Sequence, residues 1–107
     1  MDSSAQSRAM VRAALADKVD MLARELPRLS PVHMAYAVDD IRREANGYRL
    51  DTLATLASKL ERAIATSPSA AVVLPYLEAM GDALEYDEVS PDRQAALLAS
   101  VSIRLHR

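Results

Sequence analysis

The chain has 107 residues; 50% are hydrophobic, 26% are charged, and the formal net charge is −2. This length suits one domain, over residues 1–107, and the composition is that of a globular rather than a disordered chain. The near-neutral charge argues against nucleic acid as a partner, because binding it needs a basic surface. With no Cys in the sequence, disulfides and Cys-based metal sites are excluded.

Two features of the sequence concern location. No apolar run approaches the roughly 20 residues that a membrane-spanning helix needs. Residues 1–7 are mostly polar, so we expect no signal peptide. The sequence therefore predicts a cytoplasmic protein with no membrane partner.

Leucine and alanine are abundant, whereas Phe and Trp are absent, and this composition favours helices over strands.

The first two predicted helices are separated by a short link after Pro27. The first runs from about residue 4 to 26, with an inward stripe of Leu15, Val19, Leu22 and Leu26. The second opens with Ser30 as its N-cap, followed by Pro31. We expect Asn46-Gly47 to close it, because both residues tolerate a left-handed backbone. Its inward stripe is Met34, Val38, Ile41 and Ala45.

Three more amphipathic segments follow. Residues 50–66 place inward Leu53, Leu56, Ala57, Leu60 and Ile64, and residues 70–86 place inward Val73, Leu77, Met80 and Leu84. Pro75 either kinks the fourth helix or marks its first turn, and Gly81 either weakens this helix or marks a close contact. Ser90-Pro91 begins a fifth helix that ends near residue 106, with an inward stripe of Leu98, Val101 and Leu105. Because the turns are short, we predict an all-α, up-down antiparallel helix bundle of four core helices plus one extra helix.

Signatures of catalysis are scarce. There is no Gly-rich phosphate loop, and neither His33 nor His106 has a metal-ligand partner at helical spacing. We interpret His33 as a solvent-facing residue in the first turn of its helix. An acidic run without Lys or Arg could bind a cation or a basic partner, but its spacing matches no calcium loop, which favours a solvated face. That run contains Glu78, Asp82, Glu85, Asp87, Glu88 and Asp92. We therefore expect that the protein is not an enzyme, and that it has no catalytic residue and binds no cofactor or metal.

The segment from Val38 to Glu61 resembles the core of histidine-containing phosphotransfer domains. In that family one helix carries His-x-x-Lys-Gly, and after a short turn a second helix begins with Gly-Leu and ends in Leu-Glu. Residues 50–61 follow the second helix, Arg42 falls at the lysine, and Arg43 falls at the glycine. Asp39 falls at the phosphorylated histidine, and Arg49 replaces the glycine before Leu50. The resemblance implies the family's bundle but not its chemistry, because an aspartate cannot form a phosphoramidate.

The outer side of the second predicted helix is the candidate site. At about 100° per residue, its members lie away from the inward stripe. They are Val32, Tyr36, Asp39 and Arg43, flanked by Arg42. We call these five residues the docking strip. We expect Asp39 to be exposed, as a transfer site would be. The strip is either an exposed protein-contact patch or a second buried side of the helix that packs on another helix.

These observations predict a non-catalytic, phosphotransfer-like binding module. Its expected partner is a receiver domain or a histidine kinase, and its expected role is to modulate two-component signalling without carrying phosphate. The alternative is a structural bundle that self-associates, for example as a homodimer, since alanine-rich helices pack closely. A third alternative uses the acidic run for metal binding or catalysis.

Overall fold

The computed structural model describes the backbone of residues 3–85 and the side chains of residues 7–85. This part of the chain forms four α-helices and a single 3-10 turn, and it contains no strand. The elements are α1 (Ser3–Glu25), η1 (Leu26–Arg28), α2 (Pro31–Gly47), α3 (Asp51–Thr66) and α4 (Ala70–Glu85). The predicted fifth helix lies outside the described residues.

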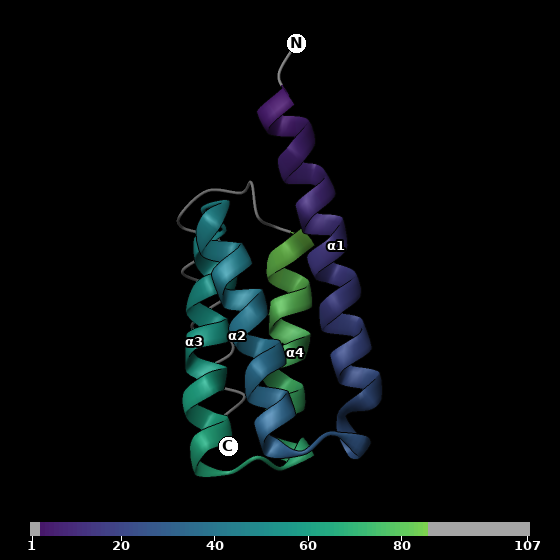
Figure 1. Cartoon of the computed structure of the whole chain (residues 1–107), viewed down its shortest axis with the longest axis vertical. Coiled ribbons are helices and arrows are strands. Elements are labelled where there is room, and N and C mark those ends of the chain that lie inside the picture. Colours follow the sequence, from purple (N-terminus) through teal and green to yellow (C-terminus); the bar gives the residue numbers. More distant parts are fainter. Residues whose placement is uncertain (1–2, 86–107) are drawn as a thin grey trace.

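Consecutive helices run in opposite directions and close into a bundle (Figure 1). The neighbouring pairs are α1 with α2, α2 with α3, α3 with α4, and α4 with α1. Of these pairs, α2 with α3 is the most closely packed and α1 with α2 the least. The predicted all-α, up-down bundle of four core helices is therefore confirmed. Within the described residues, no helix has the length and apolar character needed to cross a membrane.

The core is formed by the four stripes predicted from helical periodicity. Every residue of these stripes is buried, and the exposed fraction of each is at most 7%. The core also includes residues beside the stripes, namely Leu50, Ala54, Ala79 and Ala83, together with the buried Thr52. Small alanine side chains allow neighbouring helices to approach, which brings residues flanking the central stripe out of solvent. The bundle thus needs no Phe or Trp to fill its interior.

The turn between α2 and α3 differs from the prediction. Neither Asn46 nor Gly47 adopts a left-handed backbone; Arg49 does, with φ 57°. The Arg49 amide donates to the Asn46 carbonyl at 3.2 Å, and the Leu50 amide donates to the Ala45 carbonyl at 2.8 Å. This pair of bonds is a Schellman motif, which satisfies the last carbonyls of α2 and packs the apolar residue after the turn back onto the helix.

The other helix signals have mixed outcomes. Ser30 caps α2 as predicted, its hydroxyl accepting a hydrogen bond from the His33 amide at 3.2 Å. Pro75 lies inside α4, at the sixth residue, and so does not mark the first turn. Gly81 also lies inside α4, but a Cβ added there would meet nothing within 4 Å. Gly81 therefore does not mark a close helix contact.

Candidate functional site

The two apolar residues of the docking strip are exposed on α2. Val32 is 60% exposed and Tyr36 is 70% exposed, so neither packs in the core. Both lie in the half of α2 that follows the Ser30 cap, whereas the charged members of the strip lie further along the helix. The described structure therefore presents a large aromatic side chain and a branched apolar one to solvent on the same outer side of α2.

Asp39 lies between two arginines of its own helix. Its carboxylate accepts hydrogen bonds from the guanidinium groups of Arg42 and Arg43, three and four residues further along α2. Only 24% of the Asp39 side chain is exposed. The expectation that Asp39 is exposed is therefore wrong: it is half-buried, because the two neighbouring guanidinium groups cover its carboxylate.

Arg42 connects the docking strip to α3. Its Nε donates to Glu61 Oε1 at 2.9 Å while its NH2 group donates to Asp39. Its side chain is 30% exposed, whereas that of Arg43 is 73% exposed. Arg42 is thus held between two helices, and this is the part of the strip that packs on another helix. Arg43, by contrast, has a largely exposed side chain: its Nε and one terminal nitrogen donate to Asp39, and its other terminal nitrogen donates to no described residue.

The ion pairs change the acidity of the groups that form them. Hydrogen bonding from Arg42, and then from Arg43, lowers the pKa of Asp39 below its ordinary value of 3.8. The carboxylates of Asp39 and Glu61 in turn raise the pKa of Arg42. Asp39 is therefore a carboxylate at neutral pH, with both oxygens occupied as acceptors, and the strip carries a fixed charge rather than a titratable group.

His33 is exposed and interacts locally. Its Nδ1 lies 2.7 Å from the hydroxyl of Ser30, within the first turn of α2. The predicted solvent-facing position of His33 is confirmed. This contact belongs to the start of the helix, one turn before Tyr36, and no other described side chain hydrogen-bonds to the ring.

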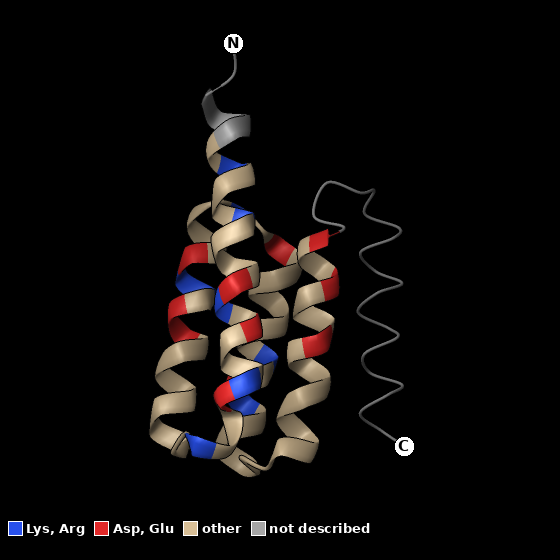
Figure 2. Ribbon diagram, turned by 90° about the vertical axis from the view of Figure 1, so that its right-hand side faces the viewer, with Lys and Arg blue, Asp and Glu red and all other residues tan. Residues whose placement is uncertain are grey.

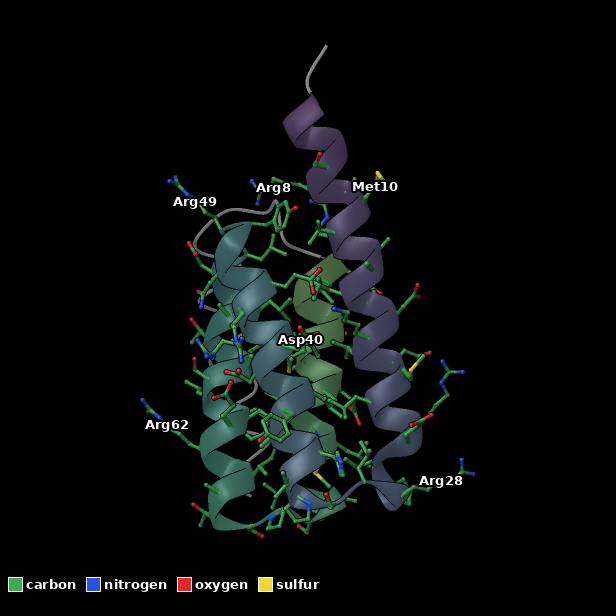
Figure 3. All side chains as sticks on the ribbon, viewed as in Figure 1. Arg8, Met10, Arg28, Asp40, Arg49 and Arg62 are labelled. Carbon is green, nitrogen blue, oxygen red and sulfur yellow. The ribbon has the colours of Figure 1, made fainter. Side chains whose placement is uncertain are left out.

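An open hollow lies between α2 and α3 at the Arg42 end of the docking strip, and three charged residues are among those that line it. It is lined by Arg42, Ser58, Glu61, Arg62 and Ala65 and has a volume of about 430 Å³. Figure 3 shows Arg62 extending from α3 into solvent. Because the Arg42–Glu61 ion pair belongs to this hollow, the charged surface of the site extends from α2 to α3.

Sequence reasoning missed a second charged cluster, which joins α1 to α2. Lys18 Nζ donates to Asp40 Oδ2 at 2.9 Å and to Glu44 Oε2 at 2.6 Å. These two carboxylates raise the pKa of Lys18, with Glu44 contributing most. Asp40 and Glu44 are four residues apart, which could have suggested a shared cation. The identity of that cation depends on how α1 packs, and helical periodicity does not give it.

The described part of the acidic run lies on α4. Figure 2 shows acidic residues and no basic residue along this helix. Glu78 and Glu85 are exposed and Asp82 is half-buried; the remaining members of the run lie outside the described residues. Between residues 7 and 85, no three His, Asp or Glu side chains lie close enough to hold a metal ion.

Comparison with known proteins adds no relative: no family model, no curated protein and no solved structure matches this chain.

Proposed function

We propose that the chain is a non-catalytic, phosphotransfer-like binding module that docks a partner protein through the outer side of α2. The observation that carries the proposal is the exposure of Tyr36, at 70%, beside the ion-paired Asp39 and Arg43. An exposed aromatic ring adds little to the stability of a helix, but it supplies a rigid contact area at low entropic cost. Together with an adjacent arginine it has the composition of an interface centre.

The partner we propose is a receiver domain or a histidine kinase. In the resemblance to phosphotransfer domains, Asp39 takes the place of the phosphorylated histidine, and in this chain Asp39 lies on the outer side of the bundle. The largely exposed side chain of Arg43 suits the carboxylates that cluster at a receiver's active site. Asp39 places a negative charge beside it, and repulsion from the same carboxylates would weaken the dock or alter its geometry.

The turn before α3 supports the resemblance. Arg49 occupies the place at which the family has a glycine, and Arg49 is the left-handed residue of the turn. A left-handed backbone is the conformation that glycine adopts without steric cost. The α2–α3 hairpin therefore has the backbone that the family's Gly-Leu pair would favour, although the glycine itself has been replaced.

Asp39 also explains why the proposed module carries no phosphate. A phosphoramidate needs a ring nitrogen, and Asp39 offers carboxylate oxygens that are both engaged by arginines. Arg43, at the place of the family's glycine, donates two hydrogen bonds to one of these oxygens. On this proposal the module acts by occupying a partner's surface and thereby modulates phosphotransfer between other proteins.

The test combines a phosphotransfer assay with a binding assay. The full chain is mixed with a phosphorylated receiver domain and, separately, with an active histidine kinase, and acid-labile phosphate on the chain is measured. We expect no labelling, together with saturable binding of the receiver or the kinase by calorimetry. Labelling that disappears in a His33→Ala variant would overturn the proposal, because His33 would then be a transfer site. An absence of binding to either class would also overturn it.

A second candidate function is self-association. The observation that favours it is a set of large apolar side chains exposed on two helices, which are Met10, Met21, Val32 and Tyr36. Burial of such side chains between two copies would stabilise a dimer. Measurement of the mass in solution over a range of concentrations separates the two candidates. A mass that rises with concentration to that of a dimer favours self-association, and a constant monomer mass favours the docking module.

A further inference from the structure

The least closely packed neighbours in the bundle, α1 and α2, leave an apolar groove between them. Its volume is about 260 Å³. Leu22 and Ile41 form its floor and are buried, whereas Leu29 and Ala37 are half-buried along its walls. Met21 lies at the edge of the groove and is 55% exposed. The groove is separate from the docking strip, because no residue of the strip lines it.

The rim of this groove carries an excess of negative charge. Lys18 is the one ammonium among the lining residues, and it binds both Asp40 and Glu44. Glu25, one of the lining residues, forms no ion pair with any residue of the described range. The lining residues therefore include one positive charge and two carboxylates, Glu25 and Asp40, and the positive charge is shared with Glu44 outside the lining.

Two cations close to Glu25 in the sequence do not offset this excess. Arg24 is paired with Asp20, four residues before it on α1, at 2.9 Å. Figure 3 shows Arg28, the last residue of η1, extending into solvent away from α2. Figure 3 also labels Asp40 in the region of α2 that faces α1, where its carboxylate meets Lys18. The acidic rim is thus left to be matched by an external group.

We propose that this groove binds a short, basic amphipathic helix of a partner protein. Along α1 the lining runs from Lys18 to Glu25, which is about 10 Å at 1.5 Å per residue, or two helical turns. A third helix fits such a groove because the side-chain ridges of a helix pack between those of its neighbours. Its apolar side chains cover Met21 and Ala37, and its lysines or arginines pair with Glu25 and Asp40. This inference does not depend on the proposed docking of a receiver or kinase.

The chain has no Cys, so a single introduced thiol reports on the groove. Met21→Cys places the thiol at the groove edge, and Met10→Cys, on the same helix, places a control outside the lining residues. Met10 is 69% exposed and Met21 is 55% exposed, so both thiols of the full chain should react readily with a maleimide reagent. The probe is a synthetic leucine–lysine peptide with leucines three and four residues apart. A second peptide has glutamate at every lysine position.

We expect the lysine peptide to slow labelling of Cys at position 21 in a saturable manner, and to leave position 10 unaffected. The glutamate peptide should protect neither position. Glu25→Gln should weaken binding of the lysine peptide about two- to fivefold, the usual range for one exposed ion pair. Glu78→Gln, which removes the same charge from α4, should leave this binding unchanged.

Several results would overturn the inference. Equal protection by both peptides would show that charge does not select the occupant, and equal protection of both positions would show non-specific binding. Failure of the lysine peptide to protect position 21 would show that the groove does not bind such a helix. If position 21 reacts far more slowly than position 10 without peptide, the groove is already covered. If the labelling rate at position 21 then depends on protein concentration, a second copy of the chain covers the groove. If the rate does not depend on concentration, residues 86–107 of the same chain cover it.

Discussion

Arg42 Nε lies 2.9 Å from Glu61 Oε1, and this ion pair ties the outer side of α2 to α3. The same guanidinium also binds Asp39, so one arginine links two carboxylates on different helices. Arg43 binds Asp39 as well but contacts no second helix through a hydrogen bond among the described residues. The two neighbouring arginines therefore differ in role: Arg42 contributes to the packing of the hairpin, and Arg43 belongs to the surface.

The first prediction concerns the acidity of Asp39. Its folded-state pKa is lowered, so its ion pairs contribute stability above the ordinary pKa of 3.8, and this contribution is lost as the pH falls through the folded-state value. An NMR titration of the carboxyl group should place its midpoint below 3.8. Arg42→Gln should raise that midpoint more than Arg43→Gln, because the hydrogen bond from Arg42 is the largest single cause of the shift. Arg24→Gln on α1 is the control and should leave it unchanged.

The second prediction concerns the left-handed residue between α2 and α3. Arg49→Gly should stabilise the protein by about 0.5–1 kcal/mol, because glycine adopts a positive φ without the steric cost that a Cβ imposes. The free energy of unfolding is measured by urea denaturation. Arg49→Ala retains the Cβ and is the matched control, for which we expect no such gain. Equal gains in both variants would mean that the arginine side chain, and not the backbone, is the source of the cost.

The third prediction concerns Gly81 inside α4. Gly81→Ala should stabilise the protein by about 0.5–1 kcal/mol, because alanine loses less conformational freedom than glycine when a helix forms. The added methyl group has space, since nothing lies within 4 Å of its position. Thermal and urea denaturation provide the measurement. A loss of stability would contradict the open space beside this residue.

The fourth prediction concerns the core. Leu53→Ala or Leu60→Ala should each destabilise the bundle by about 2–5 kcal/mol, through lost burial and the cavity left behind. Leu53 is 2% exposed and Leu60 is fully buried, and both lie on the face of α3 that packs in the bundle. Urea denaturation measures the loss, and circular dichroism should keep a helical spectrum without strand signal. A cost well below this range would mean that the core collapses around the missing side chain.

The four stripes and the direction of each helix could be predicted because both depend on local sequence. Leu15 and Val19 reveal an inward face by their spacing alone, and a short link such as the one after Pro27 forces the next helix to return. Helix ends are harder to predict. Asn46-Gly47 has the right composition for a left-handed cap, but α2 continues through both residues and the turn places Arg49 there instead.

For surface residues, the sequence predicts only which side of their own helix they occupy. The angles of Val32 and Tyr36 on α2 place both residues away from the inward stripe but leave open whether another helix covers them. The structure decides between these alternatives, because both side chains are exposed. Other surface features depend on the rotation and separation of neighbouring helices. These are the Arg42–Glu61 ion pair beside Asp39, the Lys18 cluster and the groove beside Met21. Periodicity within one helix does not determine either quantity, so these features could be found only from the folded arrangement.

The last prediction separates the roles of the docking strip. Tyr36→Ala and Arg43→Glu should leave helix content and melting temperature nearly unchanged, because both side chains are at least 70% exposed. Each should weaken binding of the receiver or kinase by about 1–2 kcal/mol or more, the usual scale for central interface residues. In Arg43→Glu the new carboxylate also lies four residues from Asp39, at a cost of a few tenths of a kcal/mol. Arg43→Gln is the control without that repulsion.

Two outcomes would contradict the docking role of the strip. If Tyr36→Ala unfolds the protein, the ring contributes to the core and the exposed-patch interpretation fails. If both variants bind a confirmed partner as tightly as the native chain, the contact lies elsewhere. The acidic surface of α4, with Glu78 and Glu85 exposed, would then be the next surface to mutate. Charge reversal at those two positions should weaken the binding of a basic partner, whereas the same change at Arg62 on α3 should not.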